Sequence, residues 1–116
     1  MLFRSAKLWY DEDLNRSERA LSEAQRLSEA RGMSNPRILN NLAVLQHLNG
    51  KLDDARELYQ KALVDAATLD PSLTDNTNTT ILYNLARAYE AQGEASLAAD
   101  AYEKLLSRHP EYVDGA

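Results

Sequence analysis

The feature that most constrains the fold of this chain is a repeat within its own sequence. When Asn41-Leu42-Ala43 is aligned with Asn84-Leu85-Ala86, the register continues without gaps through both copies. Chance explains a single match but hardly a whole series in register, so the chain is expected to contain two copies of one structural unit. The other matching pairs are Gly50 and Gly93, Ala55 and Ala98, Tyr59 and Tyr102, and Leu63 and Leu106.

Each copy has the pattern of a helical hairpin. Apolar residues recur at helical spacing before Gly50, and a second amphipathic run follows this glycine, which suits the left-handed conformation that ends many helices. Two helices joined by so short a turn pack antiparallel. We expect paired alanines to let the two backbones approach closely, with a tyrosine beside each pair: Ala43 and Ala55 with Tyr59, and Ala86 and Ala98 with Tyr102.

Proline, glycine and asparagine mark the predicted helix boundaries. We expect Asn35 to cap a helix that has Pro36 in its first turn, and Gly32 to end the helix before it. The residue before a proline disfavours helix, so Asp70-Pro71 and Pro110 are each expected to end a helix. The full repeats are then predicted at residues 36–70 and 76–110, and residues 111–116 are expected to begin a further helix.

The connection between the two repeats is longer than the pattern requires. Gly50 and Gly93 lie 43 positions apart (93 − 50), whereas a tetratricopeptide repeat has a period of about 34 residues. We expect roughly nine inserted residues within Val64 to Thr77. They should lengthen the helix before a polar loop at residues 72–78, with Asp75 or Thr77 capping the next helix. A HEAT-type repeat of roughly 42 residues is the alternative, but the glycine and alanine positions fit the tetratricopeptide pattern better.

The first third of the chain, residues 1–33, is predicted to be a partial or divergent repeat. Arg16 to Ala30 is an amphipathic run that resembles the second helix of a repeat. Leu2 to Tyr10 is then expected to be what remains of the first helix, with Asp11-Glu12-Asp13 as the turn. The prediction for residues 1–116 is a single all-α domain, a tetratricopeptide-repeat superhelix of about five to six antiparallel helices.

Composition and motifs exclude several classes of function. The chain of 116 residues is 44% hydrophobic and 27% charged, which favours a folded domain, and its net charge of −5 offers no electrostatic footprint for nucleic acid. It contains no cysteine, and no apolar run approaches the roughly 18 residues of a membrane helix. His47 and His109 lack further ligands at metal-binding spacing, and no phosphate loop or nucleophile motif is present. We therefore expect no catalysis and no cofactor.

A protein partner is expected on the concave face, where solenoids bind extended or helical peptides. Asn41 and Asn84 occupy equivalent repeat positions, where an asparagine can serve either the structure or a ligand. Chaperone-binding tetratricopeptide domains hold a carboxylate with a lysine, but the matching positions here hold Asn40 and Val44, so a chaperone adaptor is not expected. The predicted partner-binding residues are Arg37, Asn40, Asn41, Val44, His47, Thr80, Tyr83, Asn84, Arg87 and Glu90.

Several short motifs are more specific than the repeat itself. They are Ile38-Leu39-Asn40-Asn41, Tyr83-Asn84-Leu85-Ala86-Arg87 with Tyr89-Glu90-Ala91, and His109-Pro110 followed by Tyr112-Val113-Asp114. With the lengthened connection, they resemble the tetratricopeptide subunit of the RNA polymerase II-associated factor complex, the Cln-three-requiring protein nine family. Gln46 and Leu105 depart from that pattern. The resemblance implies an internal fragment of a nuclear scaffold for transcription elongation and histone modification, with protein subunits of a multisubunit complex as partners.

Two further expectations concern the setting of the chain. The alternative function is an unrelated tetratricopeptide adaptor that binds a peptide in a cytoplasmic assembly, and the flanking sequence would separate the two functions. Exposed apolar ends of solenoids need a polar cap. The last predicted hairpin has no covering helix, so self-association is expected through Leu97, Ala101 and Leu105.

Overall fold

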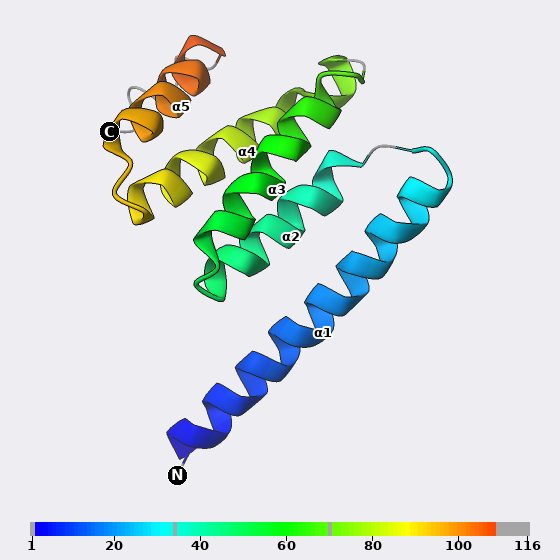
Figure 1. The fold of residues 1–116 in the computed structure, drawn as a ribbon, viewed down its shortest axis with the longest axis vertical. Helices are drawn as coiled ribbons and strands as arrows, with labels where there is room; N and C mark the ends of the chain where they lie inside the picture. Colours follow the sequence, from blue (N-terminus) through cyan, green and yellow to red (C-terminus); the bar gives the residue numbers. More distant parts are fainter. Residues whose placement is uncertain (1, 34, 70, 109–116) are drawn as a thin grey trace.

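Five helices make up the described part of the chain in the computed structural model (Figure 1). The backbone is described for residues 2–33, 35–69 and 71–108, and the side chains for residues 12–33, 35–69 and 76–108. These residues contain no strand, which confirms the predicted all-α class. The helices are α1 (Leu2–Ala30), α2 (Pro36–Leu48), α3 (Leu52–Ala66), α4 (Pro71–Ala91) and α5 (Ala95–Arg108).

The helices run back and forth, each antiparallel to the one before it (Figure 1). The molecule measures 47 × 39 × 22 Å, and its shortest dimension corresponds to about two helix diameters. Helices α2 and α4 contact each other as well as α3, whereas no contact joins α3 to α5 within the described residues. The stack therefore has an inner side formed by α2 and α4 and an outer side formed by α3 and α5.

A glycine in the left-handed conformation follows three of the helices. Gly32 and Gly50 have φ angles of 67° and 79°, as predicted, and Gly93 repeats the feature with 76°. After Gly50 the backbone N–H of Lys51 donates to the carbonyl oxygen of Gln46 at 2.8 Å. This hydrogen bond gives a partner to a carbonyl group that the end of a helix otherwise leaves free.

Substitution of Gly50 by alanine is expected to lower the free energy of unfolding by about 1–2 kcal/mol, because an L residue is strained in the left-handed conformation. A Cβ at this position would meet no atom within 4 Å, so the cost is conformational and not steric. Gly50→Asn should cost less, because asparagine tolerates this conformation better. Urea denaturation measures the difference, and equal midpoints for all three proteins would contradict this role of the glycine.

The core is built around the paired alanines. Ala43 and Ala55 are 0% exposed, and their counterparts Ala86 and Ala98 are 0% and 3% exposed. All four belong to one cluster of buried residues, which confirms that small side chains occupy the helix contacts of both hairpins. Tyr59 lies in the same cluster at 1% exposure. Its counterpart on α5 is only partly buried, because no further described helix covers α5 as α4 covers α3.

The first third of the chain differs from the prediction. Leu2–Ala30 is one continuous helix, so the predicted turn at Asp11-Glu12-Asp13 is wrong. That acidic run contains neither glycine nor proline, and charged side chains on a solvated helix surface leave the backbone hydrogen bonds intact. Helix α1 has 29 residues against 13 in α2, and its N-terminal half extends past α2 in Figure 1.

The predicted loop before α4 is also wrong. Helix α4 begins at Pro71, so residues 72–78 are helical, and Asp75 and Thr77 lie inside the helix instead of capping it. Proline suits the first helical position, because its missing N–H has no helical partner there in any case. Pro36 occupies the same position in α2, and the side chain of Asn35 caps that helix as predicted.

The inserted residues lengthen α4 and leave α3 unextended. Helix α3 ends at Ala66 after 15 residues, similar to the 14 of α5, whereas α4 has 21 residues against 13 in α2. The difference between α4 and α2 corresponds to about two helical turns. The predicted helix end at Pro110 and the further helix at residues 111–116 lie outside the described residues.

Candidate partner-binding face

The predicted partner-binding residues all lie on α2 and α4. Residues three or four positions apart share one face of a helix, so each set forms a row along its helix. The two helices contact each other, and the two rows therefore form one continuous surface, the inner face. All of the predicted residues except Tyr83 and Glu90 line one of two hollows on this face.

The first hollow, called the polar hollow, has a volume of about 480 Å³. Its lining consists of amide, hydroxyl and guanidinium groups. The Thr80 hydroxyl already donates to the carbonyl oxygen of Asn76 at 3.1 Å, but the amide and guanidinium N–H groups are donors of the kind that the carbonyl oxygens of an extended peptide accept. Asn76 and Thr77 were missed as site residues, because the loop predicted for residues 72–78 hid their spacing from Thr80 along one helix. The lining residues are Arg37, Asn40, Asn41, Asn76, Thr77 and Thr80.

The second hollow, called the apolar hollow, has a volume of about 190 Å³. Leu48, 54% exposed, and the buried Tyr59 contribute to it but were not predicted. Leu48 sits at the end of α2 beside the turn, and Tyr59 comes from the outer helix α3, so the spacing of inner-helix residues indicated neither. The lining residues are Val44, His47, Leu48, Tyr59, Asn84 and Arg87.

A side-chain hydrogen bond separates the two hollows. Asn84 Nδ2 on α4 donates to Asn40 Oδ1 on α2 at 3.2 Å, and Asn40 is 8% exposed. Asn41, the repeat counterpart of Asn84, is exposed and lines the polar hollow. The structural and ligand-binding roles considered for this repeat position therefore differ between the copies: Asn84 joins the two inner helices, and Asn41 remains accessible.

Aromatic and charged side chains form a cluster at the α5 side of the inner face. The rings of Tyr83 and Tyr102 meet edge to face with centroids 6.4 Å apart, and the guanidinium carbon of Arg87 lies 5.9 Å from the Tyr83 centroid. The Tyr102 hydroxyl donates a hydrogen bond to the Glu90 carboxylate. Tyr83 remains 42% exposed, so the cluster presents an aromatic ring whose position is fixed by its neighbours.

Stability is expected to fall at high pH through Tyr102. Burial, followed by the hydrogen bond to Glu90, raises the pKa of this hydroxyl from 10.0 to about 12. A folded-state pKa above the unfolded one means that the protonated phenol favours folding, so its contribution is complete below pH 10 and is lost toward pH 12. Burial also raises the pKa of Tyr59 to about 12, so Tyr102→Phe should remove part of the loss. Thermal melting across this window measures it, and a profile unchanged by the substitution would contradict the assignment.

The apolar residues predicted to drive self-association are not exposed. Ala101 and Leu105 are 5% and 2% exposed, and Leu97 is partly buried against the core. Helix α5 uses this stripe to pack on α4, and the same side chains cannot meet a second chain at the same time. The burial of these side chains argues against the predicted route, and self-association itself stays a prediction.

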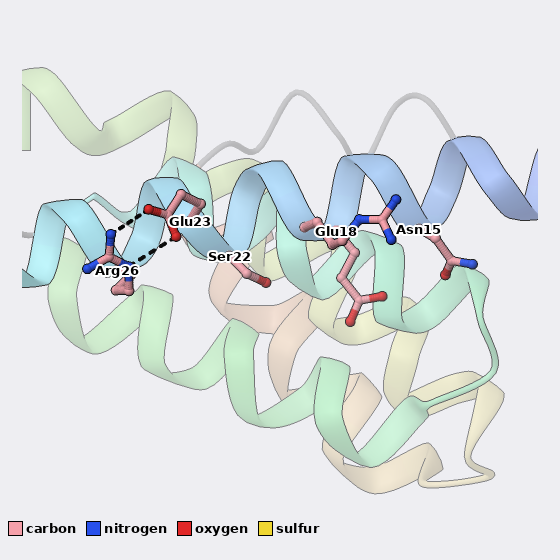
Figure 2. A pocket seen from close by; sticks show the side chains of 6 residues that line it. Asn15, Glu18, Ser22, Glu23 and Arg26 are labelled. Carbon is pink, nitrogen blue, oxygen red and sulfur yellow. Dashed lines mark hydrogen bonds and ion pairs between the residues drawn. The ribbon is translucent and has the colours of Figure 1, made fainter.

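A third hollow lies beside α1 (Figure 2). Three of its four charged side chains have partners: Arg26 Nε donates to Glu23 at 3.0 Å, and Glu18 accepts from Gln46 Nε2 of α2 at 2.8 Å. The hollow is lined by a single helix with balanced charge, and its Glu18 contact helps to hold α1 on α2. The lining residues are Asn15, Glu18, Arg19, Ser22, Glu23 and Arg26.

The described residues show no metal-binding arrangement. Where side chains are described, no three His, Asp or Glu residues are grouped so that they could hold a metal ion. In the same part of the chain, none of the helices combines the length and the apolar character needed to cross a membrane. The inner face can bind a partner through hydrogen bonds, cation–π contacts and apolar contacts.

Comparison with known proteins agrees with this architecture. Residues 6–71 match a sequence profile described as tetratricopeptide repeat, and residues 81–112 match a second profile of the same description. The chain is also 34% identical over 110 residues to "Tetratricopeptide repeat protein 1" of Schizosaccharomyces pombe. That match covers 94% of the chain but 10% of the relative, so the chain spans about a tenth of the length of that protein.

Proposed function

Since the chain belongs to the tetratricopeptide-repeat family, whose repeats generally mediate protein–protein interactions and are typically non-catalytic, we propose that its inner face binds a peptide segment of a partner protein. The profile matches favour this family over the HEAT-type alternative. The observation that carries the proposal is the continuous surface of α2 and α4, in which two hollows of different chemistry lie on either side of the Asn40–Asn84 hydrogen bond.

The two hollows suit different parts of one peptide. Donors in the polar hollow can form hydrogen bonds with backbone carbonyl oxygens of the peptide, and the apolar hollow can accommodate one of its aliphatic side chains. Arg87 lines the apolar hollow and Tyr83 contacts Arg87 beside it, and these two residue types supply much of the binding energy at many interfaces. On the inner face, the apolar hollow can therefore hold one side chain of the peptide, and the polar hollow can hydrogen-bond to the peptide backbone that follows it.

We further propose that this binding serves a nuclear multisubunit complex for transcription elongation and histone modification. Support comes from the motifs around Asn40-Asn41, Tyr83-Asn84 and His109-Pro110 and from the lengthened connection, which resemble the tetratricopeptide subunit of the polymerase-associated factor complex. These motifs are scaffold residues, so the expected partners are other protein subunits. A cytoplasmic adaptor is the competing setting, and capture from separate nuclear and cytoplasmic extracts distinguishes the two.

The test is a pull-down from nuclear and cytoplasmic extracts with the purified chain, read by mass spectrometry. The variant combines Asn41→Ala, Tyr83→Ala and Arg87→Ala, and the matched control combines Lys51→Ala, Glu57→Ala and Glu103→Ala, which are exposed positions outside the inner face. Circular dichroism must show equal helicity for all three proteins.

The expected result is capture of elongation-complex subunits by the wild type and the control but not by the inner-face variant. Capture of only cytoplasmic proteins, lost in the same variant, would support the inner face and contradict the nuclear setting. Equal capture by all three proteins would contradict the inner face as the binding surface.

A further inference from the structure

A groove crosses the outer side of the stack, where the C-terminal ends of α3 and α5 flank the early turns of α4. Its volume is about 490 Å³, and we call it the outer groove. It shares no residue with the inner face. Leu63 comes from α3, Asn78 and Leu82 come from α4, and Lys104, Ser107 and Arg108 come from α5.

The floor of the outer groove combines apolar surface with an unused hydrogen-bond acceptor. Leu82 is 4% exposed and Leu63 is partly buried against the core. Asn78 Oδ1 is buried and has no hydrogen-bond partner among the residues whose side chains are described. A carbonyl oxygen is a hydrogen-bond acceptor, and leaving it buried without a donor is unfavourable. The floor therefore suits a group that brings an N–H next to an aliphatic side chain.

The rim of the outer groove is positively charged. Lys104 and Arg108 lie one helical turn apart on α5, and both are exposed. Neither forms an ion pair among the described residues, although Asp100 lies one turn before Lys104. The side chains of Lys104 and Arg108 are therefore available to pair with negative charges next to the apolar surface of Leu63 and Leu82. They form a local positive patch in a chain whose net charge is −5, and such a patch favours a negatively charged partner.

The helix beneath the outer groove is also locally unusual. Residues 72–80 consist mostly of Ser, Thr, Asn and Asp, which have weak helix propensity, yet they form the first turns of α4. Conflicts between local preference and adopted structure concentrate at functional sites. The inserted turns bring Asn78 to the outer groove, so the insertion supplies the acceptor that a ligand would use.

We propose that the outer groove binds an acidic peptide segment of a second partner protein. An aliphatic side chain of the segment packs on Leu63 and Leu82, its backbone N–H donates to Asn78 Oδ1, and its carboxylates pair with Lys104 and Arg108. Binding here leaves the inner face free, so one short stack of helices holds two partners on opposite sides.

The probe is a blocked peptide of alternating Asp and Leu, titrated into the ¹⁵N-labelled chain and followed by NMR. The expected shifts are at the backbone amides of Leu82, Lys104 and Ser107 and at the side-chain NH₂ of Asn78. Lys104→Glu with Arg108→Glu should weaken binding by at least about tenfold, because both charge pairs become repulsive. The control, Arg16→Glu with Lys51→Glu, changes the net charge equally at exposed positions outside the groove and should bind as the wild type does.

Several results would overturn the proposal. They are shifts confined to the inner face, equal weakening in both charge-reversal variants, undiminished binding of a peptide with Asn in place of Asp, or no shift at millimolar peptide. Tighter binding of inorganic phosphate or a short RNA at Lys104 and Arg108 would mean that the groove recognises phosphate groups instead. Circular dichroism confirms that the variants remain folded, and the swap Lys104→Arg with Arg108→Lys should preserve binding.

Discussion

Replacement of Tyr59 by alanine is expected to lower the free energy of unfolding by about 3–5 kcal/mol, as is typical for a buried aromatic side chain. Tyr59 is 1% exposed and lies in the core cluster beside Ala55, with α4 covering α3. Its removal leaves a cavity that neighbouring helices fill only in part. Urea denaturation monitored by circular dichroism measures the loss as a lower midpoint at unchanged slope.

The matched control for this substitution is Tyr102→Ala. Tyr102 holds the equivalent repeat position, but it is only partly buried because no further described helix covers α5. Its loss should therefore cost clearly less than the loss of Tyr59. Equal costs at the two positions would mean that burial within the stack does not set the contribution of this tyrosine.

Ala55→Leu should lower the free energy of unfolding by about 1–3 kcal/mol, because a larger side chain overpacks a close helix contact. Ala55 is 0% exposed, and its counterpart Ala98 is 3% exposed, so Ala98→Leu should behave similarly. Both substitutions separate helices that small residues hold together. The denaturant midpoint is the measurement for each variant.

Ala99→Leu provides the control for these enlargements. Ala99 is adjacent to Ala98 on α5 but is exposed, so a leucine there meets solvent and should leave the midpoint nearly unchanged. Unchanged midpoints for Ala55→Leu and Ala98→Leu would contradict the register in which these alanines face the hairpin contact.

The sequence correctly predicted those parts of the fold where the local backbone conformation or the available space allows only one kind of residue. Gly50 and Gly93 take the left-handed conformation, which few other residues tolerate, and Ala43 and Ala55 take positions with room for little else. Residues 72–78 gave no such signal. Their weak helix propensity favoured a loop, and packing of the following turns of α4 on α3 overrode it, as tertiary contacts often do.

The candidate site was predictable only where regular spacing along the two inner helices was recognised, so Leu48, Asn76 and Thr77 were missed. Helical spacing by itself places Arg37, Asn40 and Val44 in one row, and these residues do line the two hollows of the inner face. Spacing along one helix carries no information about what another element contributes. Tyr59 reaches the apolar hollow from α3, and the outer groove needs three helices together, so neither was predictable from the sequence.

The contact between α2 and α4 has a consequence for how a ligand acts on the whole stack. In solenoids, stability is approximately a sum over units and over the interfaces between neighbours. Here the two hairpins meet through α3–α4 and through the smaller α2–α4 contact. A peptide that spans α2 and α4 adds its binding free energy to the boundary between the hairpins. Occupancy would then stiffen the boundary between the two hairpins, so that force or thermal fluctuation at one end of the stack is transmitted more strongly to the other.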